Sequence, residues 1–165
     1  MKVALFPGTF DPLTLGHLDL IKRGSALFDQ LAVAVMTNEN KDPLFSVDER
    51  VAQVKEAVSG LSNVSVITAE GLTVDLMNKI GADYLMRGLR NTADFRYERD
   101  ISAMNNFLDD QSETVFFLAR PEYQHLSSSL LKEVTAAGGD ISTYLPANIN
   151  NALTKRLEER QLMQV

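Results

Sequence analysis

Residues 2–17 read KVALFPGTFDPLTLGH, and this stretch decides the expected fold. Lys2–Phe6 is a short and almost entirely apolar run, which is typical of a strand covered on both faces. It leads into a loop that begins at Pro7-Gly8. Beyond the loop, Thr14 is a suitable N-cap for a helix that carries His17 in its first turn. The stretch therefore predicts a buried strand, a tight loop and a helix in direct succession.

The rest of the chain repeats this alternation. Four more short apolar runs lie at Leu31–Thr37, Val64–Thr68, Tyr84–Arg87 and Thr114–Leu118. Apolar residues at helical spacing separate or follow them, over Leu18–Phe28, Val47–Val58, Leu76–Ile80, Tyr97–Leu108, Leu130–Val134 and Ile149–Leu157. Ser46 and Glu49 have the spacing of a capping box, and Gly81 is a suitable helix stop. The pattern predicts an α/β fold: a Rossmann-like open parallel five-stranded sheet with helices on both faces.

Length and composition exclude several classes of protein. The 165 residues contain no linker or repeat, so we expect a single domain over residues 1–165. The absence of cysteine excludes disulfides, thiolate metal sites and a cysteine nucleophile. A formal net charge of −6 argues against a nucleic-acid partner. No apolar run is long enough to span a membrane, and we expect a cytoplasmic protein.

Ligands of open α/β sheets bind beyond the carboxyl ends of the strands, so functional residues are expected there. Neither common phosphate-loop motif follows the first strand. Gly8 permits a close backbone approach, and His17 at a helix N-terminus is well placed to meet an anion. The alternative is that Gly8 only shapes a turn and His17 is a surface residue. Lys41 follows the second strand. It either binds a ligand phosphate or is a solvated loop residue.

Two later segments also carry groups that bind phosphate. Arg87 and Arg90 follow the fourth strand and either hold charged oxygens or form ion pairs with Asp94 and Glu98. Ser127-Ser128-Ser129 opens a helix after the fifth strand, where hydroxyls and backbone N–H groups suit a phosphate, although a cap alone explains one of the three.

Several other polar residues have plainer interpretations. Glu98 and Asn105 flank the apolar positions Tyr97, Ile101, Met104 and Leu108, and face either a ligand or solvent. Lys132 and the charges from Lys155 to Arg160 are interpreted as solvated faces. His125 is either structural or part of a pocket wall.

These residues resemble a known family. Gly8–Pro12 followed by Thr14-Leu15-Gly16-His17 is similar to the (H/T)-x-G-H motif of the nucleotidyltransferase superfamily, and Ser127–Lys132 resembles its second signature. Arg87–Arg90, Ala93-Asp94-Phe95 and Tyr97-Glu98 narrow the resemblance to the bacterial phosphopantetheine adenylyltransferase family. Phe6 and Ala136 depart from well-known members, which have a tyrosine and, in some cases, an arginine at these positions.

The resemblance implies transfer of AMP from ATP to 4′-phosphopantetheine, giving dephospho-coenzyme A and pyrophosphate without a covalent intermediate. It implies Mg²⁺, a homohexamer and feedback binding of coenzyme A. It assigns catalysis to His17, Lys41 and Arg90, and substrate binding to Thr9, Lys41, Thr73 and Arg87. The implied ATP site consists of Thr9, Phe10, His17, Gly88, Leu89, Arg90, Glu98, Tyr123, Gln124, His125, Leu126, Ser127, Ser128 and Ser129.

Physical chemistry agrees with this reaction, because the substrate phosphate is already a nucleophile. The reaction needs two aligned polyanions and positive potential, which we expect from His17, Lys41, Arg87, Arg90 and helix N-terminal amides. Three alternatives stay open: an adenylyltransferase for nicotinamide mononucleotide, a cytidylyltransferase, and a nucleotide sensor without catalytic activity. No local pattern identifies the metal ligands, for which Asp11 and Asp94 are candidates.

Overall fold

The structure is a computed structural model that describes residues 1–37 and 43–162. Its strands are β1 (Val3–Gly8), β2 (Gln30–Met36), β3 (Val64–Ala69), β4 (Tyr84–Leu89) and β5 (Glu113–Leu118). Its α-helices are α1 (Leu15–Leu27), α2 (Val47–Ala57), α3 (Thr73–Ile80), α4 (Thr92–Leu108), α5 (Ser128–Ala136) and α6 (Ala147–Leu162). Every strand and helix expected from the sequence is present, with small shifts at the ends.

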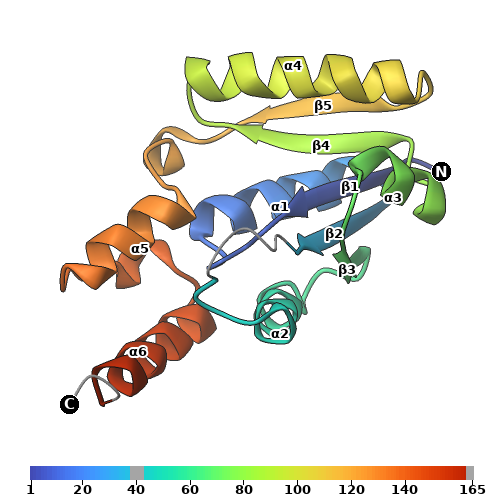
Figure 1. The fold of residues 1–165 in the computed structure, drawn as a ribbon. Coiled ribbons are helices and arrows are strands. Elements are labelled where there is room, and N and C mark those ends of the chain that lie inside the picture. The colour runs from blue at the N-terminus through green and yellow to red at the C-terminus, as the bar shows by residue number, and fades with distance from the viewer. Residues whose placement is uncertain (38–42, 163–165) are drawn as a thin grey trace.

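The five strands form one parallel sheet in the order β3-β2-β1-β4-β5 (Figure 1). The chain starts in the middle of the sheet, adds β2 and β3 on one side and then returns to add β4 and β5 on the other. The order therefore reverses between β1 and β4, and their carboxyl ends meet there.

Alternate strand residues pack into two layers. Leu31, Val33 and Val35 of β2 belong to the larger core cluster, together with residues of α1, α2, α5 and α6. Ala32 and Ala34 face the opposite way and pack against α3. On that same side, α4 contacts α3 and β4. The prediction of an open parallel sheet with helices on both faces is confirmed.

Local signals act as expected at two helix ends. The Ser46 side chain accepts a hydrogen bond from the Glu49 backbone N–H, and the Glu49 carboxylate accepts one from Ser46, so the capping box of α2 is closed. Gly81 ends α3 in the left-handed conformation, with φ 67°. Both signals are local, which is why the sequence predicts them well.

The apolar positions of α4 differ from the other helical stripes. Tyr97 and Met104 are 65% and 58% exposed, whereas Glu98 and Asn105 are buried. Glu98 turns inward because it pairs with Arg87 of β4. We name the exposed set Tyr97, Ile101, Met104, Phe107 and Leu108 the α4 stripe.

Edge position also changes the burial of one strand. β3 lies at the edge of the sheet, where Ser65 and Thr68 are exposed and its other residues are half-buried, so it is not covered on both faces as its sequence indicated. Among the described residues, no helix is long and apolar enough to cross a membrane.

Candidate active site

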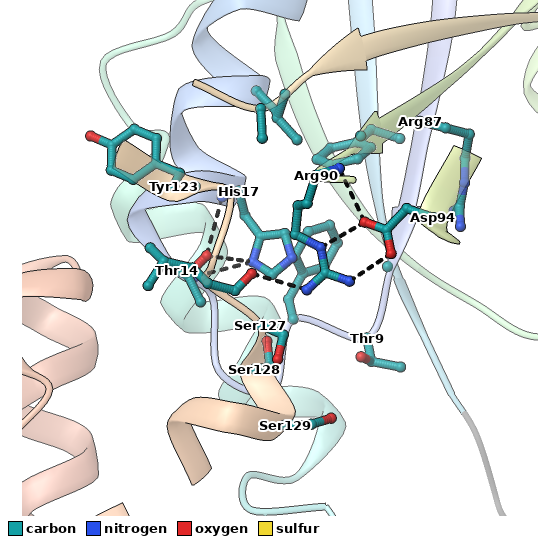
Figure 2. A pocket seen from close by; sticks show the side chains of 18 of the residues that line it. Thr9, Thr14, His17, Arg87, Arg90, Asp94, Tyr123, Ser127, Ser128 and Ser129 are labelled. Atoms are coloured by element: carbon teal, nitrogen blue, oxygen red, sulfur yellow. Dashed lines mark hydrogen bonds and ion pairs between the residues drawn. The ribbon is translucent and has the colours of Figure 1, made fainter. Parts of the chain in front are cut away.

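A cavity of about 430 Å³ lies at the carboxyl ends of β1 and β4, where the strand order reverses. This is the place that the fold class predicts for a ligand. Its walls come from the loop after β1, the start of α1, the end of β4, the start of α4 and the segment leading into α5 (Figures 1 and 2). The lining includes Thr9, Phe10, Thr14, His17, Arg87, Gly88, Arg90, Asp94, Glu98, Tyr123, Leu126, Ser127, Ser128 and Ser129.

His17 is oriented by the residue that caps its own helix. The backbone N–H of Thr14 donates to Nδ1 of His17 at 3.1 Å, and the His17 backbone N–H donates to Oγ1 of Thr14 at 3.2 Å. A nitrogen that accepts from a backbone N–H carries no proton, so the neutral ring has its proton on Nε2. Thr14 thus leaves His17 with an N–H donor on the other side of the ring (Figure 2).

The charge state of His17 differs from the sequence expectation. Burial, and to a smaller extent the nearby Arg90 guanidinium, lower the pKa of His17 from its usual 6.5 to about 4. In the ligand-free protein the ring is therefore neutral at pH 7, and counting it among the positive groups is wrong. A neutral histidine still stabilises a developing oxyanion as a hydrogen-bond donor.

The ring of Phe10 packs against the imidazole of His17. Its side chain is buried and its ring meets the imidazole edge-on, with centroids 5.2 Å apart and planes at 79°. Its backbone is left-handed, with φ 47°, which is uncommon for a bulky residue. A Cβ on Gly8 would lie 2.8 Å from the Phe10 ring, so glycine is required there for this close approach.

Arg87 and Arg90 are each held by one carboxylate and one backbone carbonyl. Arg87 makes a bidentate pair with Glu98 and donates through Nη1 to the Pro7 carbonyl at 3.2 Å. Arg90 makes a bidentate pair with Asp94 and donates through Nη1 to the Leu126 carbonyl at 3.0 Å. The ion-pair interpretation of these arginines is confirmed. Because the paired guanidinium groups also line the cavity, their binding of charged oxygens stays a prediction.

These pairs leave binding capacity on the arginines. A guanidinium carries five N–H donors, and the three bonds of each arginine leave two donors for a ligand. Burial acts to raise the pKa of Asp94, but hydrogen bonds from the Arg90 side chain and backbone outweigh it and hold that pKa below its ordinary value. Asp94 therefore stays ionised at neutral pH and fixes the Arg90 guanidinium.

The serine run brings a second helix N-terminus to the cavity. Ser127 is the N-cap of α5 and accepts from the Leu130 backbone N–H at 3.0 Å, so the capping interpretation is confirmed for this one serine. Ser128 donates to the Pro12 carbonyl at 2.8 Å, which fastens α5 to the loop after β1. Since α1 also begins at the cavity, the positive ends of two helix dipoles face one space.

Some of the expected site residues lie elsewhere. The described cavity lining does not include Leu89, Gln124, His125 or Thr73. Gln124 donates to the Ala119 carbonyl, and the His125 ring packs against Tyr144. Thr73 is the first residue of α3 and is not part of this lining. Lys41 lies outside the described residues.

Charged residues interpreted as solvated have structural partners instead. Lys132 Nζ lies 3.0 Å from Oδ2 of the buried Asp11, which also accepts from the backbone N–H groups of Leu44 and Phe45. Arg156 pairs with Glu49. Placing Lys132 and Arg156 on solvated faces is therefore wrong. The sequence could not show this, because each partner lies more than 100 residues away.

Sequence reasoning also missed Arg50. Arg50 is 3% exposed, and its guanidinium donates to the carbonyl oxygens of Thr9, Met36 and Phe45. One signal was available, because Arg50 stands three and four residues from Val47 and Val54, on the apolar stripe of α2.

The described residues do not form a metal site of their own. They contain no group of three or more histidine or acidic side chains that could hold an ion. Asp11 and Asp94, the two candidates from the sequence, are both occupied by hydrogen bonds and by a lysine or an arginine. Glu98 is occupied by Arg87.

Comparison with known proteins agrees with this geometry. A family model described as cytidylyltransferase-like matches residues 5–134. A phosphopantetheine adenylyltransferase from Limosilactobacillus reuteri is 86% identical over all 165 residues, which make up 95% of that protein. A phosphopantetheine adenylyltransferase from Limosilactobacillus fermentum is 77% identical over all 165 residues, which again make up 95% of that protein. One from Lactiplantibacillus plantarum is 52% identical over 95% of this chain and 96% of its own.

Two solved structures share the fold. A putative nicotinate-nucleotide adenylyltransferase from Vibrio parahaemolyticus has a TM-score of 0.68 at 23% identity, over 93% of this chain and 99% of its own. A lipopolysaccharide core biosynthesis protein from Thermoplasma volcanium has a TM-score of 0.56 at 24% identity, over 73% of this chain and 98% of its own. At these identities the likeness concerns the fold alone. Since the matching relatives span this chain from end to end, the chain belongs to the phosphopantetheine adenylyltransferase family, among the cytidylyltransferase-like proteins.

Proposed function

We propose that the cavity around His17 carries out the adenylyl transfer of this family. The chain transfers AMP from ATP to 4′-phosphopantetheine in coenzyme A biosynthesis. A phosphate oxygen of 4′-phosphopantetheine forms a bond to the α-phosphorus of ATP, and the bond from that phosphorus to the bridging α–β oxygen breaks. The products are dephospho-coenzyme A and pyrophosphate.

The observation that carries this assignment is the orientation of His17. Its Nδ1 accepts from Thr14, so its Nε2–H is the donor left for the α-phosphate, where negative charge grows during transfer. Arg90 lines the same cavity close to His17, and although Asp94 balances its charge, its two remaining N–H donors are available to phosphate oxygens. The amides at the starts of α1 and α5 add partial positive charge.

No protein nucleophile or strong general base is needed, because the attacking phosphate is already an anion. Catalysis then consists of alignment and compensation of charge. We assign the 4′-phosphopantetheine phosphate to Thr9, Arg87 and Lys41, and the ATP phosphates to His17, Arg90 and the Ser127–Ser129 run. Support comes from the shared cavity, which Thr9, Arg87, His17 and Arg90 all line. The assignments of Lys41 and Thr73 rest on the family resemblance.

We further propose that Mg²⁺ arrives with ATP. The described carboxylates at the cavity are each held by an arginine, which leaves phosphate oxygens and water as the natural ligands of the ion. Titration of the protein with Mn²⁺ tests this by the relaxation of water protons: the ion should bind in the presence of ATP and not without it.

The family resemblance also implies a homohexamer, and the α4 stripe supports self-association. Monomeric proteins seldom expose side chains such as Phe107, at 83%, next to Tyr97 and Met104. Light scattering after size exclusion would measure the mass of the wild type, of Met104→Glu, and of Leu27→Glu as a matched exposed site on α1. The proposal expects only Met104→Glu to reduce the mass.

We also propose that coenzyme A binds this protein as a feedback inhibitor and that the protein is cytoplasmic. Coenzyme A differs from the product by one phosphate, so it would occupy the same cavity and compete with ATP. Competition in steady-state kinetics tests the first point, and cell fractionation tests the second.

The activity itself is tested by pyrophosphate release with a set of acceptors. ATP is offered with 4′-phosphopantetheine or nicotinamide mononucleotide, and CTP is offered with a phosphorylated alcohol. Release with 4′-phosphopantetheine alone, matched by an equal amount of dephospho-coenzyme A, is the expected result. Release with another acceptor would change the substrate, and ATP binding without any release would favour a sensor.

A further inference from the structure

Arg50 of α2 connects three backbone segments beneath the cavity. Its Nη1 donates to the Thr9 carbonyl at 2.7 Å and to the Met36 carbonyl at 3.1 Å, and its Nε donates to the Phe45 carbonyl at 3.1 Å. These carbonyls belong to the loop after β1, the end of β2 and the turn that begins α2. One buried side chain therefore fixes the spacing of three segments.

The hydrogen bonds of Arg50 offset a cost of burial. Arg50 is 3% exposed on the face of α2 that also buries Val54, and burial of a charge costs free energy. An apolar side chain would avoid this cost but would leave the three carbonyl oxygens without this donor. What an apolar side chain lacks is a rigid set of donors that holds three carbonyls at fixed distances.

The Thr9 carbonyl is the link to the site. It is part of the peptide bond between Thr9 and Phe10, and Phe10 has the left-handed φ of 47°. A bulky residue keeps such a conformation only when its surroundings hold it there. The Phe10 ring fills the space against Gly8 and meets the imidazole of His17.

We propose that Arg50 is a positioning residue for adenylyl transfer: by holding the Thr9 carbonyl, it keeps Phe10 in the left-handed conformation that packs its ring against His17. The inference rests on the proposed function, and it adds a residue that makes no contact with the cavity. Arg50 acts on the rate through Thr9 and Phe10, not through substrate.

Arg156 of α6 supplies a matched control. It contacts the same turn, where Nη1 donates to the Leu44 carbonyl at 2.6 Å and its guanidinium lies 5.2 Å from the centre of the Phe45 ring. Its guanidinium donates to the Leu44 carbonyl and the Glu49 carboxylate and, within the described part of the chain, makes no hydrogen bond to Thr9. A lysine at position 156 therefore disturbs the turn and leaves the Thr9 carbonyl in place.

The test is a double-mutant cycle. Arg50→Lys, Phe10→Leu and the double variant are compared with Arg156→Lys, alone and with Phe10→Leu, at a temperature where circular dichroism shows all of them folded. Arg50→Lys should lower kcat about 10- to 100-fold, the range for a small misplacement of reacting groups, with little change in KM. Phe10→Leu should lower it similarly.

The coupling between the variants decides the proposal. If Arg50 acts through Phe10, the double variant loses no more than the larger single loss, whereas the losses from Arg156→Lys and Phe10→Leu multiply. Losses that multiply for Arg50 and Phe10, or a kcat for Arg50→Lys equal to that for Arg156→Lys, would overturn it. A wild type that makes no dephospho-coenzyme A contradicts the proposed function instead.

A second variant covers the case in which Arg50→Lys does not fold. Gly8→Ala places a Cβ 2.8 Å from the Phe10 ring and displaces that ring while Arg50 stays intact. The proposal expects a fall in kcat together with a changed ¹⁵N shift of His17 Nε2. An unchanged kcat and shift would overturn it.

Discussion

The backbone N–H of Thr14 donates to Nδ1 of His17 while the Thr14 hydroxyl oxygen accepts from the backbone N–H of His17. The capping box that begins α1 thus also fixes the tautomer of the ring at the cavity. One local motif therefore starts a helix and presents a hydrogen-bond donor to the cavity.

Loss of the His17 donor should slow chemistry without unfolding the protein. His17→Ala is expected to lower kcat about 100-fold or more, the usual cost of one lost oxyanion donor. His17→Asn keeps an N–H donor on a shorter side chain and should recover part of the loss. Steady-state kinetics with circular dichroism checks both variants, and normal turnover by His17→Ala would refute the role of His17.

The pH dependence of folding follows from the lowered pKa of His17. An unfolded chain binds a proton on this residue near pH 6.5, whereas the folded chain binds it only near pH 4. The contribution of His17 to stability is therefore present above pH 6.5 and is lost as the pH falls from 6.5 towards 4. Urea unfolding of the wild type at pH 7 and pH 5 measures the change. His17→Asn should show a smaller change, and an equal one would contradict the assignment.

Thr14 caps α1 and also contacts His17, and the Ser46 cap of α2 allows these two effects to be measured apart. Thr14→Ala and Ser46→Ala each remove a capping oxygen, so each should lower the free energy of unfolding by about 1 kcal/mol. Of the two hydroxyls, only that of Thr14 lies beside His17, 3.1 Å from Nδ1, so only Thr14→Ala should also reduce kcat. The backbone N–H that donates to Nδ1 stays in place in this variant, so the loss should be smaller than for His17→Ala. Urea unfolding and kinetics on the same samples test this pair, and equal kinetics for the two variants would show that the Thr14 hydroxyl does not act on His17.

The two ion pairs at the cavity should affect the KM of different substrates. Asp94→Asn loosens Arg90, which we assign to ATP, and Glu98→Gln loosens Arg87, which we assign to 4′-phosphopantetheine. We expect a rise in KM of about tenfold, for ATP in the first variant and for the acceptor in the second, since charge-assisted bonds are worth about 1.5–3 kcal/mol. Equal effects on both substrates would contradict the division of the cavity.

Much of the fold follows from short-range patterns in the sequence. The five apolar runs, the capping box at Ser46 and the stop at Gly81 depend on neighbouring residues, and they appear in the structure as five strands, a closed capping box and a helix end. The place of the cavity followed from the parallel topology, because carboxyl ends of parallel strands meet at one edge.

Interactions between distant segments are what the sequence did not predict. The partners of Lys132, Arg156 and Arg50 lie in other parts of the chain, so local composition made two of these residues look solvated. The neutral His17 likewise results from burial and from Arg90, which only the folded chain brings near. The helical spacing of Tyr97, Ile101, Met104 and Leu108 predicted α4 but not which face is buried, and the buried residues are Glu98 and Asn105.

The most direct test of the central claim is the stereochemical course at the α-phosphorus. The reaction is run with ATP that carries a sulfur of known configuration on the α-phosphate, and the configuration of the dephospho-coenzyme A thiophosphate product is determined by ³¹P NMR. Direct attack by the 4′-phosphopantetheine phosphate predicts inversion. Retention would show an intermediate covalently bound to the protein and would contradict a site that acts by alignment and charge alone.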